Sequence, residues 1–238
     1  MLLSTRAVVI HTFPYSDTSV IMRAYTEKVG FASFLLKGYK RNKKQKTQLH
    51  PLAIIELSFL ERNNSSLHIT RNVSSQNPHM NLLMDPIRSG VAIFLSEWLA
   101  HTIKEDEEGD PRFFSWLINA IELLNSAETI ANYHLWFILE LSKFMGFSPQ
   151  GEKTTSTPLF SLTEGSFTNR GSTTESLNEE ESTLFDQLMK RNYEEISELP
   201  LNKRERSNLL HLFHAYFQLH IDKEFKLKSL EILKQLYD

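Results

Sequence analysis

The chain has 238 residues, of which 41% are hydrophobic, so a substantial core is available. It contains no cysteine, which excludes disulfides, thiolate nucleophiles and thiolate zinc sites and fits a reducing compartment. No apolar run reaches the roughly 18 residues of a membrane helix, and the N-terminus lacks a signal-peptide pattern. We therefore expect a soluble, cytoplasmic protein.

Charge is distributed unevenly along the chain, although the net charge is only −3. Residues 1–80 hold 11 Lys and Arg against 4 Asp and Glu, whereas the remaining residues hold 15 against 25. This division indicates a module that faces a polyanion, joined to an acidic body.

The N-terminal third has the pattern of short β-strands. Runs of apolar and β-branched residues are separated by turn-forming Pro, Asp, Gly and Asn, including a predicted turn at Phe13-Pro14-Tyr15-Ser16-Asp17. The predicted strands are 6–11, 18–26, 31–36, 52–60 and 67–73. Five short strands without an intervening long helix favour a closed barrel of the oligonucleotide-binding (OB) type, which we assign to residues 1–78.

From about residue 79 the apolar spacing becomes helical. Helices are predicted to begin at Asp110-Pro111, Asn178 and Asn202, and a last helix is predicted near 227–236. We assign 79–147 and 177–238 to one all-α domain. It is interrupted by a polar insertion at 148–176, in which 18 of 29 residues are Ser, Thr, Gly or Pro. The predicted fold is therefore α+β and multidomain, with a short β-hairpin at Leu159–Thr168 inside the insertion.

No catalytic motif is present: the chain lacks a phosphate-binding P-loop, a dinucleotide-binding glycine motif and a nucleophile elbow. His211 and His214 share a helix face, but no third ligand accompanies them, so helix packing explains them better than a metal site. We expect no enzymatic activity, no cofactor, no metal and no small-molecule substrate.

The strongest signal is the basic segment, Lys37–Lys46, in which six of ten residues are basic and none is acidic. A solvated lysine-rich hairpin would also explain it. Its position between two predicted strands, with aromatic residues nearby, favours a single-strand binder that combines a cationic groove with stacking rings. We expect Phe31 and Phe34 to be core residues. The predicted DNA-binding residues are Lys37, Lys40, Arg41, Lys43, Lys44 and Lys46, together with Arg6, Arg23 and Arg71 on phosphates and Tyr15 and Tyr39 stacked on bases.

A second cationic set could receive an acidic peptide tail from a protein partner. Helix-end charges that complement the helix dipole, or that are simply solvated, explain this set at least as well. Its members are Lys203, Arg204, Arg206, Lys226 and Lys228.

Several stretches together carry a family resemblance: Ala7–Ile21, Tyr25–Gly30, Leu36–Arg41, Leu49–Leu52, and His220 with Lys226–Leu230. They resemble the RecO family of bacterial recombination mediators. The resemblance is specific in residues 6–60 and looser elsewhere.

The resemblance implies a non-enzymatic, nucleoid-associated protein that binds single- and double-stranded DNA and anneals complementary strands. It also implies two partners, RecR in RecA loading and the C-terminal tail of single-stranded DNA-binding protein. A protein–protein adaptor with weak nucleic-acid affinity and an RNA-binding OB-fold factor are the alternatives.

The chain departs from the RecO pattern at one point. Many family members carry a cysteine zinc site around the hairpin of the insertion, whereas 147–174 contains no cysteine here. Two alternatives remain for this hairpin: it is held by packing alone, or it is disordered.

Overall fold

The structure, a computed structural model, describes residues 1–39, 48–60, 67–75, 79–104, 108–169, 175–222, 224–230 and 233. It divides into two compact units. The first comprises Met1–Ala127 and a return of the chain that begins at Leu227, and the second comprises Glu128–Lys226.

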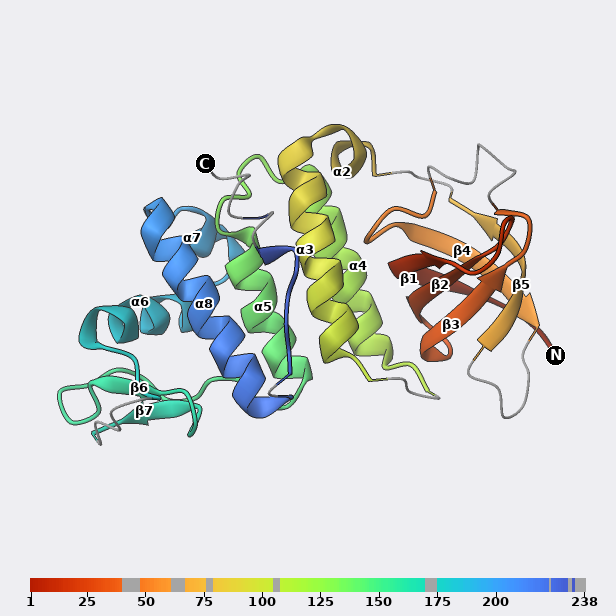
Figure 1. Ribbon diagram of the computed structural model, residues 1–238. Helices are drawn as coiled ribbons and strands as arrows, with labels where there is room; N and C mark the ends of the chain where they lie inside the picture. Colours follow the sequence, from red (N-terminus) through yellow and green to blue (C-terminus); the bar gives the residue numbers. More distant parts are fainter. Residues whose placement is uncertain are drawn as a thin grey trace. The chain divides into compact units, whose positions relative to one another are not determined.

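A closed five-stranded barrel forms the N-terminal part of the first unit, with the strand order β1-β2-β3-β5-β4 (Figure 1). Only β3 and β5 pair in parallel; the other neighbours are antiparallel. The OB-type barrel predicted from the sequence is therefore confirmed. The strands are β1 (Leu2–Pro14), β2 (Val20–Thr26), β3 (Gly30–Leu36), β4 (Ile54–Leu60) and β5 (Leu67–Ser74).

Strand β1 extends beyond the predicted 6–11 at both ends, because it begins at Leu2 and because Phe13 and Pro14 belong to the strand and not to the turn. Pro14 lies opposite Val20 at the last position of the strand, where its missing N–H is tolerated. The turn follows directly, and the Tyr15 N–H donates to the Ser19 carbonyl at 3.1 Å. A register shift between Val9 and His11 marks a bulge in β1.

The barrel interior is filled by alternate side chains of every strand. Phe34 and Phe59 lie at its centre, with ring centroids 5.1 Å apart, and both are fully buried. The predictions that Phe31 and Phe34 are core residues are confirmed. The buried cluster inside the barrel comprises Ala7, Val9, Val20, Met22, Ala24, Phe34, Leu36, Tyr39, Leu49, Ala53, Ile55, Leu57, Phe59 and Val73.

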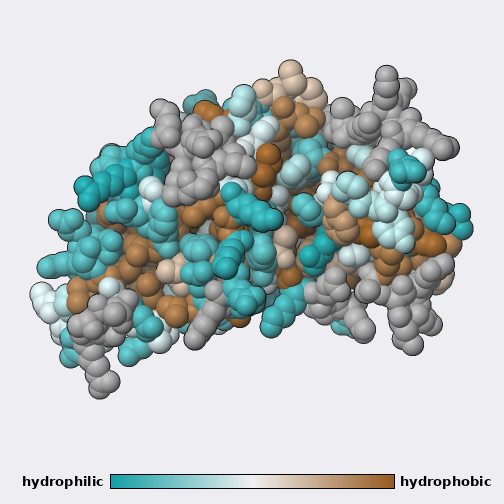
Figure 2. Space-filling view, in the orientation of Figure 1, coloured by the Kyte–Doolittle hydropathy of each residue, from teal (hydrophilic) through white to brown (hydrophobic). Residues whose placement is uncertain are grey.

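Three helices follow the barrel in the first unit: α2 (Met80–Met84), α3 (Pro86–Thr102) and α4 (Pro111–Ser126). Asp85 and Asp110 cap α3 and α4, each followed by proline at the first helical position. The Arg88 guanidinium donates to carbonyls at the end of α4, which ties the two helices together in antiparallel order. Hydrophobic residues reach the surface at α2 (Figure 2), where Met80 and Met84 are exposed.

The outer face of β2 receives the start of α4. The Tyr25 hydroxyl accepts a hydrogen bond from the Asp110 N–H at 2.9 Å, and its ring meets Phe113 edge to face at 4.8 Å. Gly109 lies so close that a Cβ there would stand 2.8 Å from the Glu27 carbonyl oxygen. Only glycine therefore fits at this approach of backbone to backbone.

The second unit contains α5 (Tyr133–Phe144), β6 (Leu159–Ser161), β7 (Ser166–Thr168), α6 (Glu179–Met189), α7 (Tyr193–Ser197) and α8 (Lys203–His220). Capping boxes open α6, α7 and α8, and the asparagines at 178 and 202 are the predicted caps. The sequence does not predict α7, because five residues are too few to show a helical period. No helix within the described ranges is long and apolar enough to cross a membrane.

Strands β6 and β7 form the hairpin at the expected position, and aromatic packing fixes it. Phe160 is fully buried, with its ring 5.2 Å from that of Phe167, 4.5 Å from Phe185 and 6.1 Å from Tyr216. The Phe160 N–H also donates to the Ser182 hydroxyl at 3.0 Å. Of the two alternatives for this cysteine-free hairpin, the structure therefore shows the packed one.

The chain returns to the first unit beyond Lys226, where the Glu97 carboxylate of α3 holds it. Backbone N–H groups of Lys228 and Ser229 donate to this carboxylate at 3.0 and 2.8 Å, and the Ser229 hydroxyl donates to it as well. Burial acts to raise the pKa of Glu97, but these hydrogen bonds outweigh it and the pKa is lowered. Leu230 and Leu233, from the predicted last helix, are helical.

Candidate nucleic-acid interface

The basic segment starts directly after β3. Lys37 is exposed, and Gly38 has φ +72°, a left-handed conformation that glycine adopts at no steric cost. The chain thereby turns sharply out of the strand. The predicted DNA-binding residues Lys40, Arg41, Lys43, Lys44 and Lys46 lie outside the described residues.

Strand register places several predicted DNA-binding residues at one end of the barrel. Leu36 lies opposite Val20, which lies opposite Pro14, so Lys37 and the turn that starts with Tyr15 share this end. The parallel pairing of β3 with β5 ends at Leu35 and Ile69, two residues before Lys37 and Arg71, and Arg71 is exposed. We call this the basic end of the barrel, defined by Tyr15, Lys37 and Arg71.

Arg23 lies further along β2 on the outer face of the barrel. It pairs with His11 on one side and Ser33 on the other, and its guanidinium lies 4.5 Å from the centroid of the Phe31 ring. This cation–π contact orients the half-buried Arg23 side chain.

Arg6 lies toward the opposite end and is not brought together with the others. Its guanidinium donates to the Glu27 carboxylate at 2.8 Å and lies 5.3 Å from the Phe114 ring centroid. The hydrogen bond from Arg6 is the main reason why the pKa of Glu27 is lowered. Glu56 lies opposite Arg6, and both acids line the same cavity of about 370 Å³. The two carboxylates balance the positive charge of Arg6, and this environment does not support the predicted contact of Arg6 with a phosphate.

Tyr39 also differs from its prediction as a stacking platform. Its side chain is only 9% exposed and belongs to the barrel core. Burial raises the pKa of its hydroxyl. Because the turn at Gly38 directs this ring inward, Tyr39 would have to leave the core before it could stack on a base. Tyr15, in contrast, is 59% exposed.

Sequence analysis did not select two further residues at the interface, His11 and Phe13. Their rings stack with centroids 5.9 Å apart and an interplanar angle of 28°. Both are exposed and lie on β1 ahead of Tyr15. The signal that could have found them is the period-two spacing His11-x-Phe13-x-Tyr15, which places alternate side chains on one face of a strand.

The proposed partner-binding cations fall into separate places. Lys203 and Arg204 are exposed in the first turn of α8, and the Arg206 side chain donates to the Leu201 carbonyl. Lys226 and Lys228 are exposed as well, but they belong to the second and first unit respectively. Cations at a helix N-terminus oppose the helix dipole, so dipole complementarity does not explain Lys203 and Arg204.

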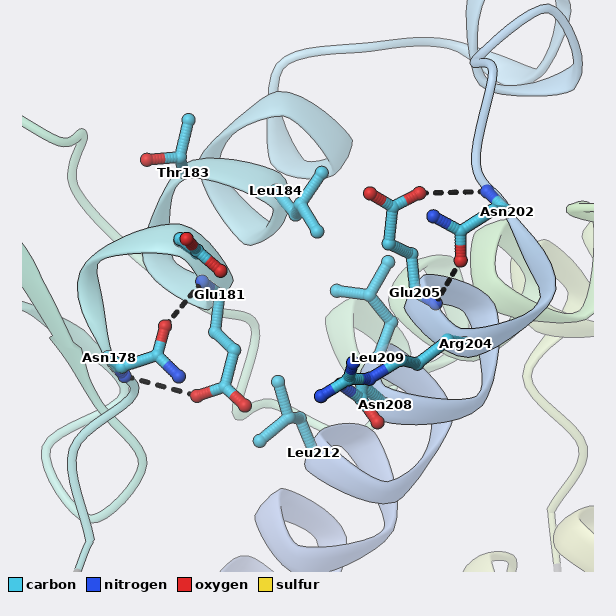
Figure 3. A pocket seen from close by; sticks show the side chains of 11 residues that line it. Asn178, Glu181, Thr183, Leu184, Asn202, Arg204, Glu205, Asn208, Leu209 and Leu212 are labelled. Carbon is cyan, nitrogen blue, oxygen red and sulfur yellow. Dashed lines mark hydrogen bonds between the residues drawn. The ribbon is translucent and has the colours of Figure 1, made fainter.

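Arg204 lines a cavity of about 670 Å³ between the starts of α6 and α8. Figure 3 shows the two capping boxes, Asn178 with Glu181 and Asn202 with Glu205, on either side of leucine side chains. The apolar lining residues are Leu184, Leu209 and Leu212. Within the described part of the chain, no group of three or more metal-ligating side chains is found.

The closed barrel and the helices that follow it place the chain among OB-fold proteins with an appended helical region. Two family models match: Recombination protein O N terminal over residues 1–78, and Recombination protein O C terminal over 83–231. Similar proteins include the DNA repair protein RecO of Bacteroides fragilis at 34% identity, of Phocaeicola vulgatus at 33% and of Flavobacterium psychrophilum at 32%, each over the full length of both chains. The chain therefore belongs to the RecO family of DNA repair proteins.

Proposed function

We propose that this chain is a non-enzymatic recombination mediator. It binds single- and double-stranded DNA through the basic end of the barrel, promotes annealing of complementary strands and assists RecA loading with RecR. The observation that carries this proposal is the position of the basic segment. It begins directly after β3 of an OB-type barrel, at the end where Tyr15 and Arg71 are also exposed. Binding at such a site consists mainly of phosphate neutralisation and ring stacking, and needs no covalent chemistry.

Neutralising the basic segment tests this proposal. Replacing Lys40, Arg41, Lys43 and Lys44 with Ala removes four of the six cations and should weaken single-stranded DNA binding strongly. With about 0.7 counterions released per contact, the slope of log K against log salt should flatten from about −4 by about 3. Fluorescence anisotropy in a salt titration measures both effects.

The matched control removes the same charge from exposed positions elsewhere, through Ala at Lys104, Arg112, Lys143 and Lys190. It should keep nearly the wild-type slope. The proposal would be contradicted if the basic-segment variant kept its affinity for single-stranded DNA, or if this variant and the control lost equal affinity. The companion assay is annealing of strands coated with single-stranded DNA-binding protein.

For the partner tail, we propose that Lys203 and Arg204 receive an acidic peptide such as the C-terminal tail of single-stranded DNA-binding protein. Both are exposed in the first turn of α8, Arg204 lines the cavity between α6 and α8, and the positive end of the α8 dipole adds to their charge. Reversing both charges to Glu should weaken binding of an acidic-tail peptide by at least about tenfold. Reversal of the exposed Lys143 and Lys190 serves as control, and equal effects would exclude this surface.

The two alternatives give different outcomes in the same assays. A protein–protein adaptor would bind the peptide but show little DNA affinity at moderate salt. An RNA-binding factor on the same barrel would prefer RNA when RNA and DNA of one sequence compete for it.

A further inference from the structure

Three rings lie at alternate positions along the chain on the outside of the barrel: His11 and Phe13 on β1, and Tyr15 directly after this strand. Phe13 and Tyr15 are 36% and 59% exposed. The His11 and Phe13 rings are stacked. We call these three side chains the ring column.

The strand register shows that the ring column points away from the core. Met22 and Val20 face the interior, and they lie opposite Thr12 and Pro14. His11 and Phe13 lie opposite Arg23 and Ile21, which face outward. The hydrogen bond from Tyr15 to Ser19 extends this pairing by one residue, so alternation puts Tyr15 on the outer face as well.

Other rings of the same outer surface are covered, unlike the ring column. Tyr25 and Phe31 also face outward, and both are buried, Tyr25 against Phe113 at the start of α4. The ring column is consequently not part of the core, and the protein pays a solvation penalty for keeping two large rings in water. Such exposed rings beside cations are the typical arrangement of a single-strand binding surface.

We propose that the ring column stacks on unpaired bases of a single DNA strand and leaves their hydrogen-bonding edges free for pairing with a complementary strand. This inference rests on the proposed DNA-binding and annealing function. Lys37 at the same end of the barrel holds the phosphates, and Arg23 lies beside His11 across the strand pair. Bases are then held by their faces, not by their edges.

The chemistry favours single strands over duplexes. Every base has a π-face, so stacking is tolerant of sequence, but in a duplex those faces are covered by the neighbouring base pairs. Phosphates are accessible in both forms. The cations of the basic end should therefore contribute to binding of both kinds of DNA, whereas the ring column should contribute only to binding of single strands.

The test replaces Phe13 and Tyr15 with Thr, separately and together, because Thr suits an exposed strand position. Each replacement should lower the affinity for a thymidine oligonucleotide by about tenfold, while affinity for a duplex stays within about twofold. Annealing should slow even at protein concentrations that saturate the strands. Phe13→Tyr and Tyr15→Phe keep a ring and should retain wild-type behaviour.

The matched control is Leu2→Thr, since Leu2 is 60% exposed at the other end of the same strand. Ultraviolet crosslinking of the oligonucleotide, mapped by mass spectrometry, should mark Phe13 or Tyr15 in the wild-type protein. If the Thr variants keep their single-strand affinity, or lose equal affinity for single strands and duplexes, the proposed stacking of the ring column on bases is wrong. The proposal of DNA binding itself would remain. Failure of the wild-type protein to bind any DNA overturns the proposed function and this inference together.

Discussion

Glu97 shows how one carboxylate can fix a segment that is distant in sequence. Its oxygens accept the backbone N–H groups of Lys228 and Ser229, more than 130 residues away, and Ser229 is buried. Without this acceptor, two backbone donors and a hydroxyl would lose their partner. Hydrogen bonds to a charged group contribute more than neutral ones, so this residue should matter more than its surface position suggests.

Glu97→Ala should therefore destabilise the protein by about 1.5–3 kcal/mol in urea unfolding near pH 7. The lowered pKa of Glu97 also predicts a pH dependence. Because the folded pKa lies below the ordinary value of about 4.3, this stabilisation is present above that value and is lost as pH falls through the folded pKa. Glu97→Gln should remove this part of the acid sensitivity.

Replacing the exposed Glu194 with Gln is the control for these measurements. It should leave both the unfolding free energy and its pH dependence close to wild type. Identical behaviour of the two Gln variants at about pH 4 and about pH 7 would contradict the role of Glu97.

At the level of single elements, aromatic packing holds the β6–β7 hairpin against α6 and α8. Phe160 connects Phe167 of the hairpin with Phe185 of α6 and Tyr216 of α8. The order of this hairpin thus depends on one buried ring and its neighbours. The cost of deleting a buried phenylalanine side chain combines lost burial with the cavity left behind.

Phe160→Ala should destabilise the second unit by about 3–5 kcal/mol in chemical denaturation followed by tryptophan fluorescence. Leu219→Ala changes a 39% exposed residue of α8 and should alter stability by no more than about 0.5 kcal/mol. A small effect of the Phe160 change would mean that the hairpin is held by its backbone pairing instead.

Elements with a clear period or cap were predictable, and those set by distant partners were not. The barrel strands and the helix starts at Asp110, Asn178 and Asn202 follow from local sequence. The inward turn of Tyr39 depends on core space that no local pattern reveals. Likewise, Arg6 is paired with Glu27, 21 residues away, and the charge of Arg6 alone did not reveal this partner.

For the molecule as a whole, the division of charge along the sequence separates the barrel from the chain that follows it, and it falls within the first unit. The excess of Lys and Arg lies within residues 1–80, which include the whole barrel, and the acidic excess lies in the chain that follows. A polyanion should therefore approach the barrel first at low salt, with steering that weakens as ionic strength rises.

The return of the chain at Leu227 has a consequence for biosynthesis. The ribosome completes Glu128–Lys226 before it makes the residues that bind Glu97. Domains usually fold from the N-terminus as they emerge, but here the first unit waits for residues made about 100 positions after Ala127. The barrel-bearing unit is thus the last to be finished, and a nascent chain holds a completed second unit before this first unit is closed.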